Sequence, residues 1–106
     1  GINCNDDDLI THIWITSDTD SYEKEIPKEF ADLQSLEGIF LGRSNLKGTI
    51  PKELAKLRKL KMLWLESNKL TGPIHTEFGN IRGLLQLNLN DNQLIGTLPT
   101  EFAKLQ

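Results

Sequence analysis

The sequence is poor in cysteine, in basic charge and in long apolar segments. Cys4 is the single cysteine among 106 residues, so no disulfide can form within the chain. Lysine and arginine number 12 against 15 aspartates and glutamates, a net charge of −3, which argues against a general nucleic-acid-binding protein. No apolar run approaches the roughly 18 residues that indicate a membrane span. We therefore expect no nucleic-acid partner and no membrane contact within this segment.

Motifs that carry chemistry are also scarce. The sequence has no glycine-rich phosphate loop, no zinc-ligand spacing and no serine, histidine and aspartate set that a fold would bring together. The acidic run Asp6-Asp7-Asp8 lacks the spacing and the glycine of a calcium loop, so a solvated acidic loop is favoured over a metal site. His12 and His75 are expected to be surface residues. We predict a protein that is not an enzyme and that uses no cofactor and no metal.

What the sequence does contain is an internal repeat of 24 residues, the step between Ile26, Ile50, Ile74 and Leu98 (50−26, 74−50, 98−74). Other apolar and glycine positions align at the same step. The columns are Leu33, Leu57, Ile81 and Leu105; Leu36, Leu60 and Leu84; Ile39, Leu63 and Leu87; Leu41, Leu65 and Leu89; Leu46, Leu70 and Leu94; Gly48, Gly72 and Gly96; and Phe30, Leu54, Phe78 and Phe102. This agreement indicates a stack of similar structural units.

Each column has a physical interpretation. Apolar residues two positions apart, such as Leu63 and Leu65, predict a short strand with one face in the core. Stacking the turns buries that face and pairs the strands into a parallel sheet. Apolar residues three apart after Pro27 and Pro51 suit a short helical turn, with 3-10 geometry as one possibility, on the outer side.

Two further columns are expected to support the turns. Gly48, Gly72 and Gly96 suit a tight bend where φ is positive or a side chain would clash. Asn68 and Asn92 follow the strands and can point inward, so that each amide satisfies backbone groups of adjacent turns. Ser44 takes this place in the first full repeat, where the polar column is weaker.

The columns read LxxLxxLxLxxNxLxGxIP, which resembles the plant-type leucine-rich repeat of receptor-like kinase ectodomains and polygalacturonase-inhibiting proteins. The resemblance covers residues 26–106. It implies a right-handed solenoid of the α/β class, with a parallel β-sheet on the concave face and short 3-10 or helical turns on the convex face. It also implies an extra short strand near the Gly-x-Ile segment. We divide the chain into a partial N-terminal cap and irregular first turn, residues 1–25, and three repeats plus the start of a fourth, residues 26–106.

The segment before the repeats is similar to the cap that precedes the first repeat in this family. In that cap the cysteine pairs with another one upstream, so the resemblance implies a disulfide partner of Cys4 that this chain lacks. We expect a fragment of a longer array, and an extracellular or cell-surface location. The sequence has no Asn-x-Ser/Thr sequon, which leaves an intracellular repeat protein as an alternative.

The concave face is the candidate binding surface, because the residue between the two strand leucines points out of the core. That column reads Trp14, Phe40, Trp64 and Asn88, and it predicts an apolar stripe bordered by Met62, Arg43, Glu66 and Asn90. Gly38 and Gly42 flank Phe40 and predict a shallow depression. Exposed aromatic rings beside charges and amides favour recognition of a protein or peptide. The alternative is that the rings shield the sheet as cross-strand pairs.

A second interpretation makes the domain an accessory or scaffold subunit of a larger assembly. Its docking residues would be the basic run of the second repeat: Lys52, Lys56, Arg58 and Lys59. A solvated face is the simpler interpretation of that run. A third class, a binder of ice or of cell-wall polysaccharide, requires a regular polar column on a flat face, and the outward columns vary too much to favour it.

Overall fold

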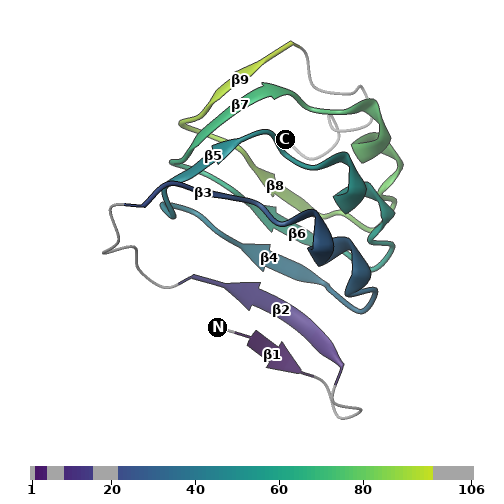
Figure 1. The fold of residues 1–106 in the computed structure, drawn as a ribbon. Coiled ribbons are helices and arrows are strands. Elements are labelled where there is room, and N and C mark those ends of the chain that lie inside the picture. Colours follow the sequence, from purple (N-terminus) through teal and green to yellow (C-terminus); the bar gives the residue numbers. More distant parts are fainter. Residues whose placement is uncertain (1, 5–8, 16–21, 97–106) are drawn as a thin grey trace.

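The protein is a stack of similar turns in which two β-sheets face each other and short 3-10 helices line one side (Figure 1). A computed structural model describes residues 2–4, 9–15 and 22–96. The first sheet contains β1 (Ile2–Cys4), β2 (Ile10–Trp14), β4 (Gly38–Phe40), β6 (Met62–Trp64) and β8 (Gln86–Asn88). The second sheet contains β3 (Lys24–Glu25), β5 (Leu46–Gly48), β7 (Lys69–Pro73) and β9 (Gln93–Ile95). The helices are η1 (Lys28–Asp32), η2 (Lys52–Lys56) and η3 (Thr76–Asn80).

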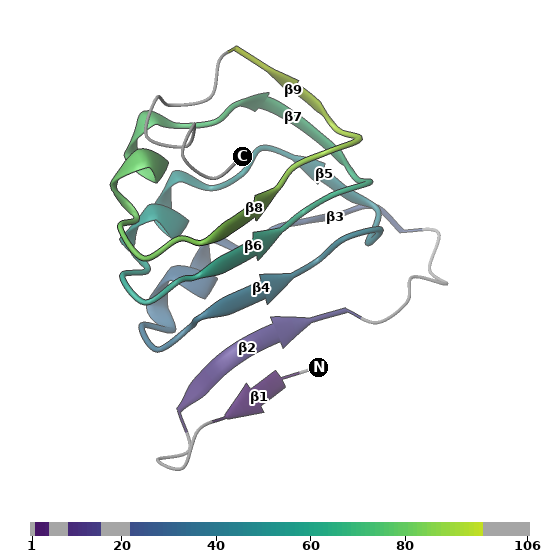
Figure 2. The same cartoon turned by 180° about the vertical axis from the view of Figure 1, so that it is seen from behind.

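The first sheet is parallel from β2 to β8, and its strands are in register at the repeat step. Gly38 pairs with Met62 and Met62 pairs with Gln86, so equivalent positions of successive turns are direct neighbours. Figure 2 shows these strands stacked one above the other, with β1 at the lower edge. The leucine-rich-repeat solenoid predicted from the columns is confirmed, with its parallel sheet and its short 3-10 turns.

The edge strand β1 was not part of that prediction. It pairs with β2 in the antiparallel direction, and the register shifts between Asn3 and Cys4. Thr11, buried in β2, donates from Oγ1 to the carbonyl oxygen of Asn3 at 3.3 Å. Cys4 is exposed and not bonded to another cysteine. The division into a cap and repeats stays a prediction, and part of it, residues 16–21 and 97–106, lies outside the described residues.

Three strands of the second sheet end within one residue of the glycine column: β5 ends at Gly48, β7 one residue after Gly72 and β9 one residue before Gly96. Gly48, Gly72 and Gly96 have φ values of 79°, 78° and 81°, a backbone conformation that residues with a side chain adopt at a cost. At Gly72, an added Cβ would also lie 2.9 Å from Cγ2 of Thr49 in the neighbouring turn. The column therefore lets each strand turn back toward the outer side of the stack.

Gly72→Ala is expected to lower the free energy of unfolding by about 1–2 kcal/mol, because the new Cβ meets both the unfavourable φ and the Thr49 methyl group. Urea denaturation followed by circular dichroism measures the change. Gly83→Ala is the matched control, since the nearest atom to its added Cβ, the Leu60 carbonyl oxygen, is 3.8 Å away. Equal effects of the two substitutions would contradict this assignment of the glycine column.

The core lies between the two sheets and the helices. Its central leucines, including Leu36, Leu57 and Leu63, have no exposed surface. The aromatic column of the outer side is less uniform than its sequence pattern. Phe78 is 1% exposed and Leu54 is fully buried, whereas Phe30 in the lowest helix is only partly buried. Phe102 lies outside the described residues.

Asn68 joins two turns from inside the stack. Its Oδ1 accepts hydrogen bonds from the backbone N–H groups of Ser44 and Leu46, at 2.9 and 3.0 Å. Its Nδ2 donates to the carbonyl oxygens of Leu41 and Leu65, both at 2.9 Å. Because the side chain is buried, it replaces the water that these backbone groups would otherwise need.

Asn92 repeats this arrangement one turn later and is only partly buried. It accepts from the N–H of Leu70 at 3.0 Å and donates to the carbonyl oxygens of Leu65 and Leu89 at 2.8 and 3.2 Å. In the first repeat the buried Ser44 hydroxyl donates to the carbonyl oxygen of Gly42 in its own turn. The polar column is thus weaker at that turn than at the two that follow.

Candidate functional site

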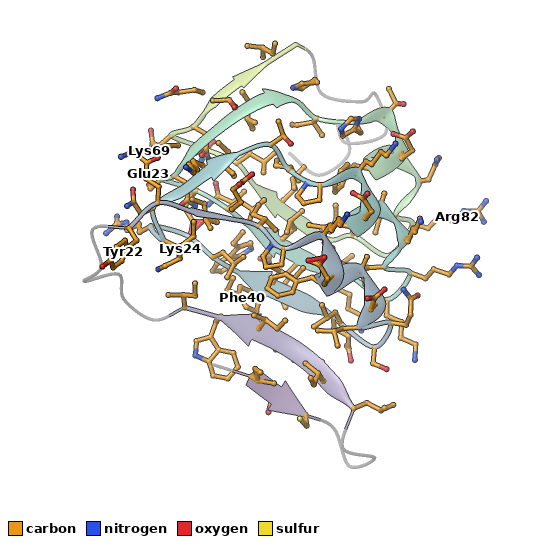
Figure 3. The ribbon with its side chains drawn as sticks, viewed as in Figure 1. Tyr22, Glu23, Lys24, Phe40, Lys69 and Arg82 are labelled. Atoms are coloured by element: carbon orange, nitrogen blue, oxygen red, sulfur yellow. The ribbon has the colours of Figure 1, made fainter. Side chains whose placement is uncertain are left out.

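The outer face of the first sheet presents a row of aromatic side chains. The register places Trp14 beside Phe40, Phe40 beside Trp64 and Trp64 beside Asn88. Figure 3 shows Phe40 among the side chains drawn on the ribbon. A backbone hydrogen bond from the N–H of Leu41 to the carbonyl oxygen of Trp64, 2.8 Å long, continues the pairing beyond the strand ends. The row that the sequence predicts is therefore formed by adjacent strands.

The rings in this row contact one another. The Phe40 and Trp64 ring centroids lie 5.1 Å apart with planes at 88°, an edge-to-face arrangement that aromatic pairs favour. Phe40 also stacks on His12, with centroids 6.2 Å apart and planes at 2°. His12 was expected to be an ordinary surface residue, and the structure makes it part of the aromatic cluster. Two features of the sequence could have indicated this contact: His12 lies two residues before Trp14, and its neighbour in the next turn is Gly38.

Trp64 is the large apolar side chain of the cluster that solvent reaches most. Its exposed fraction is 37%, whereas Trp14, Phe40 and Met62 are partly buried. The indole Nε1–H donates to Oε1 of Gln86 at 3.1 Å, so the ring is held by a residue of the next strand. Gln86 was not among the predicted site residues, because its role depends on the direction in which the indole leans.

The predicted depression around Phe40 is wrong. A Cβ at Gly38 would lie 2.7 Å from the Phe40 ring and 2.8 Å from the His12 ring, so those rings occupy the space that the glycine leaves. The space at Gly42 is occupied by the Glu66 carboxylate. Sequence alone cannot show this, because the two glycines leave room that side chains of neighbouring strands can fill.

The polar border of the row lies where the strands end. Asn88 accepts at Oδ1 from the N–H of Asn90 at 3.2 Å, and Asn90 is exposed. Arg43 is exposed and has a φ of 54°, and its N–H donates to the carbonyl oxygen of Glu66 at 2.9 Å. Ser67 and Asp91, at the equivalent places of the next turns, both have a φ of 58°. The predicted residues Arg43, Glu66, Asn88 and Asn90 therefore border one face.

The basic run lies on the side of the stack that the 3-10 helices line. Lys52 and Lys56 are exposed on η2, and Arg58 and Lys59 are exposed in the turn that follows. A hollow of about 460 Å³ beside η2 is lined by both basic and acidic side chains: Lys52, Glu53, Ala55, Lys56, Glu77 and Asn80. The charge there is mixed rather than purely basic. Docking of a larger assembly through this run stays a prediction.

Charged side chains also meet along the second sheet. Lys69 of β7 forms an ion pair with Glu23 at 3.2 Å, and Figure 3 shows the two side chains together near Tyr22. Lys61 pairs with Glu37 at 3.3 Å. Both pairs are exposed enough that each contributes no more than about 1 kcal/mol to stability. Neither lies in the aromatic row.

Neither a cluster of metal-ligating side chains nor a membrane-spanning helix occurs in the described part of the chain. Within 2–4, 9–15 and 22–96, no group of histidine, cysteine, aspartate and glutamate side chains is placed to hold a metal ion. Over the same ranges, no helix has the length and apolar character needed to cross a bilayer. The acidic residues Asp6 to Asp8 lie outside the described part of the chain.

Comparison with known proteins places the fold. The family described as Leucine Rich Repeat matches residues 59–81 and 83–105. A search of curated protein sequences found no match. Among solved structures, the plant peptide hormone receptor RGFR1 in complex with RGF2 is 33% identical, with a TM-score of 0.81 over 99% of this chain. A plant ice-binding protein is 30% identical, with a TM-score of 0.84 over 98% of this chain.

A third similar structure is the ectodomain of the plant membrane receptor kinase GASSHO1/SCHENGEN3 from Arabidopsis thaliana, in complex with CASPARIAN STRIP INTEGRITY FACTOR 2. It is 36% identical, with a TM-score of 0.72 over 78% of this chain. The chain spans 10, 19 and 34% of the length of GASSHO1/SCHENGEN3, RGFR1 and the ice-binding protein, respectively.

These findings identify the chain as a leucine-rich-repeat protein, built as a solenoid with a parallel sheet on one face. It belongs to the plant type of that family, the type found in the ectodomains of plant receptor kinases.

Proposed function

We propose that the concave face of this domain binds a peptide or an extended protein segment, without catalysis, as part of an extracellular receptor or secreted recognition protein. The observation that carries the proposal is the aromatic cluster, in which Trp64 remains 37% exposed on β6, between β4 and β8. Tryptophan is enriched among the residues that dominate binding energy at interfaces. Receptors of similar fold whose structures contain a bound partner support the proposal, RGFR1 with RGF2 among them.

The cluster has the composition of an interface centre. Phe40 and Trp64 provide rigid apolar surface, and their edge-to-face contact lowers the entropy lost when a ligand orders them. Asn88 and Asn90 add amide donors and acceptors at the border, where an extended peptide needs hydrogen-bond partners for its backbone. A peptide that lies across the strands would contact the cluster and this polar border together.

The ice-binding alternative requires repeated, similar polar side chains on a flat face. The row Trp14, Phe40, Trp64 and Asn88 is aromatic and irregular. On the second sheet, the exposed positions of neighbouring strands carry Lys47, Thr71 and Ile95, which differ in charge and polarity. The side chains of this chain therefore favour recognition of a peptide over recognition of an ordered surface.

The test is to select binders from a random peptide library displayed on phage, and to measure their affinity for the chain by isothermal titration calorimetry. We expect Trp64→Ala to weaken the selected peptides by about thirty-fold, which corresponds to roughly 2 kcal/mol, because truncation removes the most exposed ring of the cluster. Circular dichroism checks that the Trp64→Ala variant is folded.

The matched control is Tyr22→Ala. Tyr22 is 75% exposed and lies just before the edge strand β3 of the second sheet (Figure 3), and its backbone carbonyl, which the substitution keeps, accepts from Asn45 Nδ2. The Tyr22→Ala variant should bind the selected peptides with unchanged affinity. Selected peptides that bind Trp64→Ala and Phe40→Ala as tightly as the original chain, or a selection that enriches no peptide, would overturn the proposal.

A further inference from the structure

The concave face contains a buried carboxylate oxygen that has no partner. Oε2 of Glu66 is inaccessible to solvent and accepts no hydrogen bond among the described residues. The side chain reaches this position because Gly42, across the strand pair, has no side chain of its own. A buried carboxylate oxygen without a donor is costly, and the cost is removed when a cationic donor reaches it.

No cation of the described chain fills this role. The ion pairs of the described residues join Lys61 to Glu37 and Lys69 to Glu23, and neither involves Glu66. Arg43 is the nearest basic residue in sequence to Gly42, yet its guanidinium forms no ion pair with Glu66 among those bonds, and its side chain is exposed. The Glu66 side chain as a whole is only partly buried, so a rotation of its carboxylate would present Oε2 to a donor from outside the chain.

Aromatic surface lies next to this carboxylate. Trp64 and Glu66 are two positions apart in the chain. The backbone N–H groups of Leu41 and Arg43 donate to the carbonyl oxygens of Trp64 and Glu66, so the strand pairing continues through both positions. The side chains of Trp64 and Glu66 therefore lie on the same face of the sheet. The Phe40 ring leans over Gly38 and the Trp64 indole bonds to Gln86. Both rings thus lean away from the row of Gly42 and Glu66, which leaves the surface between the rings and Glu66 uncovered by them.

We propose that this corner, formed by Phe40, Trp64 and Glu66, takes an arginine guanidinium of the ligand. The inference rests on the proposed function and adds the charge and shape of one ligand group. A guanidinium is planar, stacks on aromatic faces and donates two parallel hydrogen bonds to a carboxylate. An ammonium group forms a single point contact and is more strongly hydrated, so it fits this corner less well.

The experiment titrates the 15N-labelled chain with N-acetyl-arginine amide and follows the indole N–H resonance of Trp64 by NMR. The chain has two tryptophans, so Trp64→Phe assigns the resonance. We expect a saturable shift with a dissociation constant in the millimolar range, on the order of 1–10 mM for a ligand this small. The neutral isostere N-acetyl-citrulline amide should bind at least about ten-fold more weakly, since it lacks the charge.

Glu66→Gln keeps the size of the side chain and removes its charge, so it should weaken the arginine probe by about ten-fold or more. Glu77→Gln is the control, because Glu77 is exposed on η3 at the convex side. Its binding constant should equal that of the original chain. N-acetyl-lysine amide should bind several-fold more weakly than the arginine probe.

Four results would overturn the proposal. They are equal binding of the citrulline and arginine probes, equal binding of the lysine and arginine probes, an unchanged constant for Glu66→Gln, and stronger binding after Arg43→Gln. The last would show that Arg43 already occupies the carboxylate. Library-selected peptides that need Trp64 but contain no arginine would leave the proposed function standing while this inference fails, so the two failures are distinguishable.

Discussion

Asn68→Ala is expected to lower the free energy of unfolding by about 3–5 kcal/mol, because the truncation leaves two N–H donors and two carbonyl oxygens of adjacent turns buried without partners. Each such group costs about 1–3 kcal/mol, and part of the total is regained by small backbone shifts. Domains of this size are typically stable by about 5–15 kcal/mol, so the variant should unfold at a much lower urea concentration. The midpoint and slope of urea denaturation measure this directly.

Two further asparagines set the scale for that result. Asn92→Ala removes a similar set of bonds with one N–H donor fewer, at a partly buried position where water can replace the amide, and should cost about 1–2 kcal/mol. Asn80→Ala is the neutral control, because its side chain is exposed on η3, and it should change stability by less than about 0.5 kcal/mol. A loss below 1 kcal/mol for Asn68→Ala would contradict the role of the polar column.

Phe78→Ala is expected to lower the free energy of unfolding by about 3–5 kcal/mol, through lost apolar burial and the cavity left behind. The side chain is 1% exposed and lies in the core cluster at η3. Thermal denaturation followed by circular dichroism, together with urea denaturation, measures the loss.

Phe30→Ala provides the comparison at the equivalent position of the lowest helix. The ring is only partly buried, so its removal should cost about half as much. Equal losses of unfolding free energy at Phe30 and Phe78 would show that the two turns pack alike. That result would contradict this prediction, which rests on the greater exposure of Phe30. Leu85→Ala, at a residue that is 66% exposed, should be near neutral.

The fold was predictable from the sequence because its main constraints repeat. Leu63 and Leu65, two apart within a 24-residue period, determine both the strand and the face it buries. Gly72 could be assigned to a positive φ for the same reason, since its column admits no other residue. The positions of the aromatic row also follow, because parallel pairing in register makes equivalent residues neighbours.

The site itself was less predictable. Whether Phe40 leans over Gly38 or over Gly42 depends on rotamers, and these depend on side chains of neighbouring strands. The filling of Gly42 by Glu66 and the hydrogen bond from Trp64 to Gln86 arise in the same way. The antiparallel strand β1 was missed because the segment Ile2–Cys4 belongs to no repeat and has too few residues to show a period.

The in-register pairing of β4, β6 and β8 also constrains how such a protein can change in length. Loss of one whole turn would bring the Phe40 and Asn88 positions together and would leave the ladder intact. Loss of a single residue inside a strand would instead turn the rest of that strand to the wrong face, whereas a connection can differ in length, since β2 and β4 pair at a step of 26 residues and the later strands at 24. The strands therefore change in number by whole modules. Each added or deleted module exchanges one complete column of outward side chains, so recognition can diversify while the scaffold stays the same.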